Sequence, residues 1–381
     1  MRSRRASKAL LAIAAAELVI LLMLPAPADP EHPGVFGGLR TAAAQLRGKG
    51  PRTDLVQDYV GARRLAGSGD PYLPLGEAYA EVGISFHPAH RSTHPPTAFA
   101  LTLSVAWLSW DTASAVWAAL MLAAIGGAWW SLGASPAAAA ALAPATLAWP
   151  PAAWSLGQLT PIWLLGLTLA WKWRQQQGAA GAAVAVASLT KLLPALSLVP
   201  LMAAPRRRRA LLGFGAVWAA ALVLLLVLRP SVLERYVDVI RSTGDNQSAR
   251  RENAALLWAA AHNFGIAGIV AGSLLVAAVL VTALALGGEW AWWAWCWAGV
   301  ALLPIAWIYS LLPLLPAMAF CIRRGGLLSR ALVAVTLVVP LLIDPFGLPG
   351  AIRLAAATAC VGGALLLVAS APLLAPVRLS T

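Results

Sequence analysis

Charged residues are scarce in this chain: aspartate, glutamate, lysine and arginine make up 11% of its 381 residues, and hydrophobic residues make up 60%. A water-soluble domain of this length needs more charge on its surface, so the composition excludes that class of protein. Cysteine is also rare, and Cys296, Cys321 and Cys360 lie in or beside apolar runs without the spacing of a metal or redox motif. We assign the cysteines no function. A glycine-rich nucleotide-binding signature of the Rossmann type is missing as well.

Long apolar runs dominate the remaining sequence, and many approach the length that crosses a hydrocarbon core of about 30 Å. We predict an all-α, polytopic integral membrane protein, a single domain over 1–381 with about twelve spans. The first run follows the basic stretch "MRSRRASK" and is interpreted as a retained helix with its basic end in the cytoplasm, not as a cleaved signal peptide. The predicted spans are 9–26, 95–110, 112–132, 137–154, 158–173, 178–204, 210–228, 266–286, 290–308, 310–322, 329–344 and 351–374.

Acidic residues are fewer than basic ones, 15 against 28, which gives a formal net charge of +13. Such an excess can indicate nucleic-acid binding. Here the basic residues form short clusters at the ends of spans: "RSRR" near the start, "RRRR" at 206–209, and Arg323 with Arg324. This is the distribution that the positive-inside rule describes for cytoplasmic loops, so we expect no nucleic-acid partner.

Two long polar segments, 27–94 and 229–265, interrupt the spans, and both fall outside if the amino terminus is inside. They carry 11 of the 15 carboxylates and all five histidines. Solubility accounts for acids in such segments but not for the presence of every histidine. A pore or carrier would instead place polar groups near the bilayer midplane. The distribution favours an enzyme acting at the outer interface, with 27–94 as its catalytic loop and 229–265 as a second extracytoplasmic loop.

The stretch "WKWRQQQ", residues 171–177, conflicts with this topology because its basic residues would lie outside. In an alternative topology, 178–205 forms a short hairpin with "SLTKLLP" at its outer tip, and an earlier segment is re-entrant. The sequence leaves both topologies open. In either one, Lys191 is an ionisable group within an apolar stretch, which is costly unless it faces a polar cavity or an anion. A snorkelling or helix-end lysine is the competing interpretation.

The stretch "DLVQDYVGARRLAGSGDPYL", residues 54–73, is polar in an otherwise apolar chain. As a helix it places Asp54, Asp58 and Gly61 at positions i, i+4 and i+7, so both acids share one face. Such a pair can bind a metal, one acid can act as a general base, or both can simply solvate a surface helix. "GSGDPY" predicts a turn that ends the helix and sets Tyr72 back toward the membrane.

Three histidines lie in "HPAHRSTHPP", directly before the second span: His87, His90 and His94. Their spacing would line a metal site on a helix, but the neighbouring prolines argue against one regular helix, and no complete metal motif is present. We therefore favour histidines that bind phosphate or sugar hydroxyls, and we predict no metal.

Other polar groups near span ends are candidate substrate ligands. The stretch "STGDNQSARRENAALL", at 242–257, combines amides, hydroxyls and paired arginines, whose guanidinium groups match phosphate oxygens. A solvated loop with a helix cap is the alternative. "WSLGQLTP" and "WIYSLLP" each place one polar residue between spans, where it can equally be an ordinary interhelical contact. These candidates are Gln158, Asn246, Gln247, Arg250, Arg251 and Tyr309.

Six motifs follow one another from about residue 50 to 325: "DLVQDYVGARRLAGSGDPY", "HPPTAFAL", "GQLTPIWLL", "SLTKLLPAL", "GDNQS" and "WIYSLLPLLP". Their order and spacing resemble glycosyltransferase family 87 of the GT-C superfamily, the polyprenol-phosphate-mannose-dependent mannosyltransferases. The resemblance implies a GT-C-type helical bundle with a catalytic aspartate in the first outside loop. Asp58, followed by Tyr59, occupies that position, and Tyr59 and Tyr72 are further candidate substrate ligands.

The chemistry that the resemblance implies is an inverting transfer in which Asp58 takes a proton from an acceptor hydroxyl. The departing lipid phosphate needs mainly electrostatic stabilisation, for which Lys191, Arg250 and Arg251 are candidates, with one of the three histidines assisting. Family members often carry a histidine near the tryptophan of the "WIYS" region, where this chain has Tyr309. No role for a histidine is therefore carried over to that region.

The expected function is that of a multi-pass plasma-membrane glycosyltransferase with its active site on the extracytoplasmic face. It would transfer a hexose, in particular mannose, from a polyprenyl-phosphate sugar to a glycolipid or glycan, among membrane lipids and without a cofactor. A close alternative is transfer of another lipid-linked sugar such as arabinofuranose. A lipid-linked glycan transporter would need a charged path through the bilayer, yet Glu17 is the only acid deep in a predicted span. A non-catalytic assembly factor is the third alternative.

Overall fold

The computed structural model describes residues 53–67, 69–84, 90–148, 157–203, 207–248, 255–304, 306, 308–338 and 350–370 of the 381. Within these ranges the secondary structure is helical, apart from one isolated β-bridge between Pro74 and Arg91. The predicted all-α fold class is therefore confirmed. The first predicted span, 9–26, lies outside the described residues.

The described ranges contain a series of helices. In chain order they are α3 (Thr53–Ala66), α4 (Leu75–Glu81), α5 (Pro96–Ala106), α6 (Trp110–Ser131), α7 (Pro136–Ala148), α9 (Thr160–Lys172), α10 (Gln177–Thr190), the 3-10 helix η1 (Leu193–Leu198), α11 (Val199–Met202), α12 (Arg207–Leu228), α13 (Val232–Ser248), α14 (Leu256–Leu286), α15 (Gly288–Ala301), the 3-10 helix η2 (Ile308–Leu314), α16 (Leu315–Arg324), α17 (Leu327–Val338) and α18 (Gly350–Ser370).

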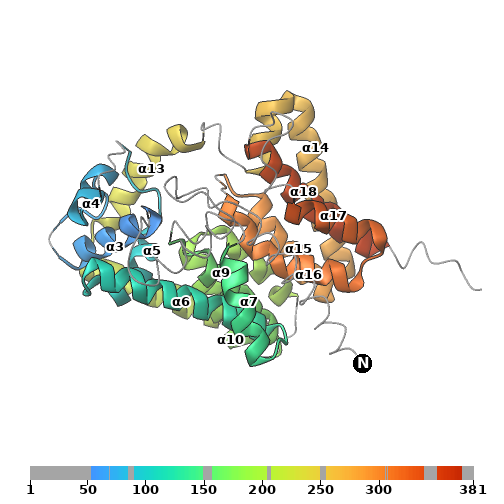
Figure 1. Cartoon of the computed structure of the whole chain (residues 1–381), viewed down its shortest axis with the longest axis horizontal. Helices are drawn as coiled ribbons and strands as arrows, with labels where there is room; N and C mark the ends of the chain where they lie inside the picture. Colours follow the sequence, from blue (N-terminus) through green and yellow to red (C-terminus); the bar gives the residue numbers. More distant parts are fainter. Residues whose placement is uncertain are drawn as a thin grey trace, which may run out of the picture.

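The polar helices gather at one side of the bundle. α3, α4, α5 and α13 lie together at the left of Figure 1, and α14 to α18 form the opposite side. α6, α7, α9 and α10 run between the two groups. The main hydrophobic core is rich in tryptophan: Trp292, Trp293 and Trp297 of α15 are buried, and Trp171 of α9 packs against the first two. α9 and α10 thus connect the group of polar helices with the tryptophan-rich core.

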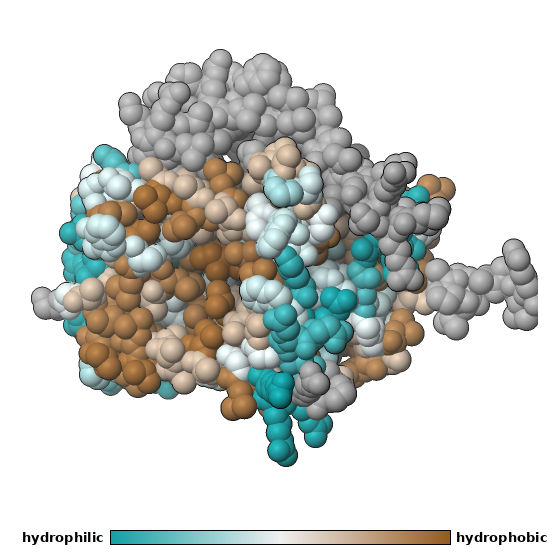
Figure 2. All heavy atoms as spheres, turned by 90° about the horizontal axis from the view of Figure 1, so that it is seen from below, coloured by the Kyte–Doolittle hydropathy of each residue, from teal (hydrophilic) through white to brown (hydrophobic). Residues whose placement is uncertain are grey.

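Three helices, α6, α12 and α14, are long and apolar enough to cross a membrane, judged by length and composition. α12 and α14 expose large aliphatic side chains such as Leu212 and Ile266, at 72% and 80%. Lipid is the solvent that accepts such a surface. Figure 2 shows the molecule from below, with broad hydrophobic areas beside a narrower hydrophilic band. These features support the predicted membrane protein, with three candidate spans among the described residues. The count of twelve spans stays a prediction, because other apolar helices are only 10–17 residues long.

α14 differs from the span predicted at 266–286 because it begins at Leu256 and contains a break at Gly265. Gly265 has φ of +60°, a conformation that glycine adopts without steric cost. The predicted start at 266 therefore corresponds to the helical part after this kink.

The segment predicted as one span at 178–204 is a hairpin, which is the alternative that the sequence left open. α10 ends at Thr190, Lys191 is extended, and η1 and α11 then return along α15. The sulfur of Cys296 accepts a hydrogen bond from the Ser197 hydroxyl, which fixes the returning arm. Lys191 therefore lies at the tip of the hairpin.

Glycines allow two pairs of helices to approach closely. A Cβ atom on Gly181 of α10 would overlap the carbonyl oxygen of Ala210 of α12. A Cβ atom on Gly61 of α3 would lie 2.8 Å from the buried ring of Phe99 in α5. Small residues at helix contacts are typical of membrane bundles, where close backbone packing stabilises association.

Candidate active site

α3 is held so that one of its acids faces the protein interior. Leu55, Val56, Tyr59 and Val60 are buried in a local hydrophobic cluster. The Tyr59 hydroxyl donates a hydrogen bond to the carbonyl oxygen of Leu108 at 2.6 Å, so Tyr59 is a structural anchor of the helix. These contacts fix the rotation of α3 about its axis.

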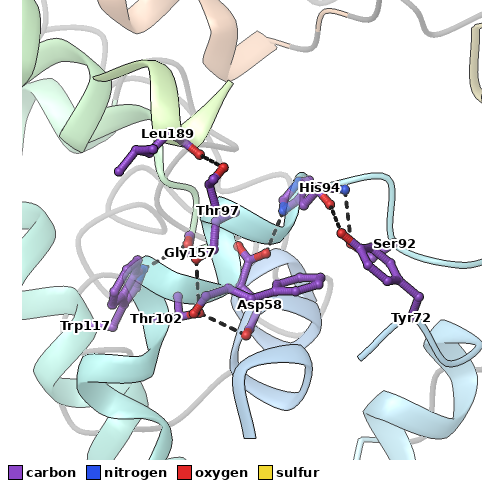
Figure 3. Close-up of polar contacts among 11 residues, drawn as sticks. Asp58, Tyr72, Ser92, His94, Thr97, Thr102, Trp117, Gly157 and Leu189 are labelled. Carbon is purple, nitrogen blue, oxygen red and sulfur yellow. Dashed lines mark hydrogen bonds and ion pairs between the residues drawn. The ribbon is translucent and has the colours of Figure 1, made fainter. Parts of the chain in front are cut away.

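Asp58 and His94 form the centre of the site (Figure 3). The Nδ1 atom of His94 lies 2.7 Å from the Oδ1 atom of Asp58, and the exposed fractions of the two side chains are 16% and 1%. On the backbone side, the Thr102 hydroxyl of α5 donates to the carbonyl oxygen of Asp58 at 3.0 Å. A carboxylate accepts hydrogen bonds, so the ring N–H of His94 is the donor in this pair.

His94 carries a positive charge more readily than an ordinary histidine. Burial lowers its pKa, but the charge of Asp58, the hydrogen bond to Asp58 and the charge of Asp54 together outweigh burial, and the pKa is raised. An imidazolium beside a buried carboxylate is a compact ion pair. The pair is shielded from water and poised to exchange a proton.

The backbone around His94 is fixed by hydrogen bonds from both sides. Tyr72 donates its hydroxyl to the carbonyl oxygen of His94 at 3.1 Å, and the backbone N–H of His94 donates to the Ser92 hydroxyl at 3.2 Å. Pro95 then precedes α5 and Pro96 is its first residue, since proline is well suited to the start of a helix. The ring of His94 is therefore presented from a rigid corner.

Asp54 lies one turn before Asp58 and is half-buried. Burial raises the pKa of Asp54 to about 6, and the charge of Asp58 adds to this effect, while the charges of His94 and Lys191 oppose it. Lys191 belongs to the same group of charges, because its charge acts on Asp54. The Thr97 hydroxyl of α5 holds the neighbouring end of α10 by donating to the carbonyl oxygen of Leu189 at 2.7 Å. The predicted shared face of the two acids is thus confirmed, and the hairpin tip brings a cation to it.

The predicted turn after α3 is confirmed. The Oδ1 atom of Asp70 accepts a hydrogen bond from the backbone N–H of Tyr72 at 2.9 Å, as in an Asx-turn. Arg229, at the end of α12, donates to the carbonyl oxygen of Gly69. The ring of Tyr72 packs against Tyr236 of α13, with centroids 5.8 Å apart. No local sequence pattern points to Arg229 or Tyr236 as neighbours of the site, because both contacts are tertiary.

Two further residues predicted to bind substrate, His90 and Gln158, are described in the structure. His90 accepts a hydrogen bond from the N–H of Leu75 through its carbonyl oxygen, so its backbone closes the loop. Gln158 is 2% exposed and its amide nitrogen has no hydrogen-bond partner within the described residues. Its neighbour Gly157 accepts a bond from the Trp117 indole, close to Asp58 (Figure 3).

The second polar segment is described only in part. Asn246 and Gln247 belong to α13, and Tyr309 belongs to η2, and only their backbone is described. His87, Arg250 and Arg251 lie outside the described residues. Among the residues with described positions, no group of three or more histidine, cysteine, aspartate or glutamate side chains could hold a metal ion.

The fold and the site define a class: a helical membrane protein with a buried carboxylate–imidazole pair at one end of its bundle. The model of glycosyltransferase family 87 matches residues 93–303, more than half of the chain, and the chain belongs to this family. It is therefore a glycosyltransferase. The matched region includes His94, Gln158 and Lys191 and begins after Asp58. Comparison with curated proteins gives no match, and neither does comparison with solved structures.

Proposed function

We propose that this glycosyltransferase transfers mannose from a polyprenyl-phosphate donor to a hydroxyl of a glycolipid or glycan. The observation that carries the proposal is the buried Asp58–His94 pair with Asp54 and Lys191 beside it. A lipid-linked donor suits a protein whose long helices expose aliphatic side chains, because the polyprenyl chain can remain in the bilayer while its phosphosugar reaches the site.

Asp58 is the proposed general base. Its carboxylate accepts the proton of the acceptor hydroxyl while that oxygen forms a bond to the anomeric carbon of the sugar. On the opposite face the bond from the anomeric carbon to the phosphate oxygen breaks, and polyprenyl phosphate leaves with the electron pair. The transfer inverts the anomeric configuration, since a single displacement needs one base and no carboxylate nucleophile.

His94 holds Oδ1 of Asp58 through its ring N–H, which leaves the other carboxylate oxygen for the acceptor. Lys191 is the proposed partner of the donor phosphate, because a cation stabilises the negative charge that develops on the leaving group. Arg250 and Arg251 remain proposed phosphate ligands from the sequence. No cofactor enters the proposed reaction.

The orientation in the membrane follows from the basic residues. Lys172, Arg174 and the arginines at 207–209 lie at the ends of α9, α10 and α12 that point away from Lys191. The positive-inside rule makes that end cytoplasmic, so we propose that Asp58 faces the extracytoplasmic side of the plasma membrane.

The test is sugar transfer by the purified full-length protein with polyprenyl-phosphate-mannose as donor. Asp58→Asn should reduce turnover by about 10²–10⁴-fold, the usual contribution of a general base. Glu77→Gln is the matched control, because Glu77 is an exposed acid of α4 in the same polar segment, and it should leave turnover unchanged. Full activity of Asp58→Asn would overturn the assignment of the base.

Two further arms separate the alternatives. Transfer from polyprenyl-phosphate-arabinofuranose but not from the mannose donor would replace mannose by that sugar. Absence of transfer from either donor, with movement of a lipid-linked glycan across vesicles, would favour a transporter. His94→Gln should lose less turnover than Asp58→Asn if His94 holds the carboxylate, and an equal loss would contradict that role.

A further inference from the structure

A cavity of about 940 Å³ lies at the end of the bundle opposite Asp58. It is formed where the connection between α9 and α10 meets α11 and the junction of α14 and α15. α10 has 14 residues, so at about 1.5 Å per residue its two ends lie about 20 Å apart. The cavity is therefore separate from the proposed active site.

The walls of the cavity are amphiphilic. Trp171, Leu201, Leu284 and Trp295 contribute apolar surface. The side of the cavity formed by the α9–α10 connection is polar, with Arg174 exposed. The Arg174 guanidinium stacks on the Trp171 ring, 4.0 Å from its centroid, and donates to the Trp171 carbonyl oxygen. This contact holds a positive charge directly above apolar wall.

Two buried polar side chains of the lining have atoms without hydrogen-bond partners among the described residues. These are Oε1 of Gln177 and Nε1 of Trp292, in side chains that are 7% and 2% exposed. A buried donor or acceptor left unpaired costs free energy. Gln177 therefore needs a donor, such as a hydroxyl, and Trp292 needs an acceptor, such as a phosphate or ester oxygen.

The electrostatics of this end favour an anion. Glu289 lines the cavity, but its carboxylate is already paired with Arg323 and Arg324 of α16. That cluster has one negative and two positive charges, and Arg174 adds another positive charge. An anionic group at the cavity mouth would meet cations on both sides.

We propose that this cavity binds an anionic phospholipid whose head group carries a hydroxyl. The phosphate lies against Arg174, the head-group hydroxyl donates to Gln177, and a lipid oxygen accepts from the Trp292 indole. One acyl chain packs along the apolar walls formed by Leu201 and Leu284. A glycerol head group has this combination of phosphate and hydroxyl, so phosphatidylglycerol is the appropriate probe. The inference does not depend on the identity of the sugar donor.

The experiment measures thermal unfolding of the purified full-length protein in dodecylmaltoside while lipid is titrated. Phosphatidylglycerol should raise the unfolding temperature in a saturable way, and phosphatidylcholine, which has no net charge and no hydroxyl, should not. Free glycerol phosphate should have no effect at the same concentration, because it lacks the acyl chain. An equal effect of free glycerol phosphate or of phosphatidylcholine would overturn the proposed lipid site.

Two variants of cavity residues and one control variant test whether phosphatidylglycerol binds in the cavity. Arg174→Gln should weaken the apparent affinity for phosphatidylglycerol about tenfold or more, since a charge-assisted contact is lost. Lys172→Gln is the matched control: Lys172 is an exposed cation at the same end that stacks on Trp130 outside the cavity, so its removal should change affinity less than about twofold.

Ala203→Phe places a ring in the cavity and should abolish the response, while the lipid-free unfolding temperature reports that the variant is folded. Equal weakening by Arg174→Gln and Lys172→Gln would show general charge attraction and overturn the specific site. A full response in folded Ala203→Phe would overturn it as well.

Discussion

Replacing His94 by glutamine removes one charge from the pair at the centre of the site. Its Nδ1 atom is 2.7 Å from Oδ1 of Asp58, and both side chains are largely buried. Loss of one partner leaves a buried charge uncompensated, which typically costs about 3–5 kcal/mol. The pKa of His94 is higher in the folded protein than in the unfolded chain, so protonated His94 stabilises the fold. This stability is fully present below the unfolded pKa and is lost as pH rises through the folded pKa. The penalty should therefore be largest below the ordinary histidine pKa and should fall as pH rises through the raised value.

The assay is equilibrium unfolding by dodecyl sulfate in mixed micelles, followed by the fluorescence of the 18 tryptophans. His94→Gln, Asp58→Asn and the double variant form a thermodynamic cycle. Two neutral amides can share a hydrogen bond, so the double variant should lose less stability than the sum of the single losses, with a coupling of about 2–3 kcal/mol. Additivity within about 0.5 kcal/mol, or a His94→Gln penalty that does not fall as pH rises, would refute the ion pair.

Three further variants test the surroundings of the site. Asp54→Asn should raise the unfolding temperature at neutral pH and leave it unchanged near pH 4. The reason is that protonated Asp54 stabilises the fold, and this stability is lost as pH rises through its folded pKa of about 6. The same effect of Asp54→Asn at both pH values would contradict this. Tyr72→Phe removes the hydrogen bond to the His94 carbonyl and should cost about 1 kcal/mol, with turnover reduced less than about tenfold in the transfer assay. Gly181→Ala should destabilise the fold by about 1–3 kcal/mol, because the added Cβ atom overlaps α12. Gly215→Ala is the control and should not destabilise the fold, because Gly215 has open space around it. Equal unfolding temperatures of the two variants would argue against the close contact between α10 and α12.

The sequence predicted the local features of the site because they depend on local physics. Helical spacing alone places Asp54 and Asp58 on one face of α3, and the Gly and Asp-Pro pattern ends that helix before Tyr72. The histidine cluster was predicted as a group, and its member His94 contacts the carboxylate of Asp58. His94 and Asp58 are 36 positions apart, so no periodicity connects them.

The hairpin at Lys191 shows why the topology stayed open. Its two arms are both apolar, and a hydropathy pattern does not distinguish a hairpin of two short helices from one long span. Tertiary hydrogen bonds stabilise the hairpin: the Thr97 hydroxyl donates to the carbonyl oxygen of Leu189, and the Ser197 hydroxyl donates to the sulfur of Cys296. With the hairpin in place, "WKWRQQQ" and the arginines at 206–209 lie at the same end of the bundle as far as they are described, which removes the conflict in the charge distribution.

The close approach of Gly61 to Phe99 has a consequence for natural variation. Gly61 takes part in no chemistry, yet it sits one turn after the proposed base and leaves no room for a Cβ atom while the Phe99 ring stays buried. A larger residue at 61 would push α3 from α5 and draw Asp58 away from His94. In descendants of this sequence we therefore expect positions 61 and 99 to change together, a gain of volume at one with a loss at the other. The spacing of these two helices would then be inherited more strictly than either amino acid.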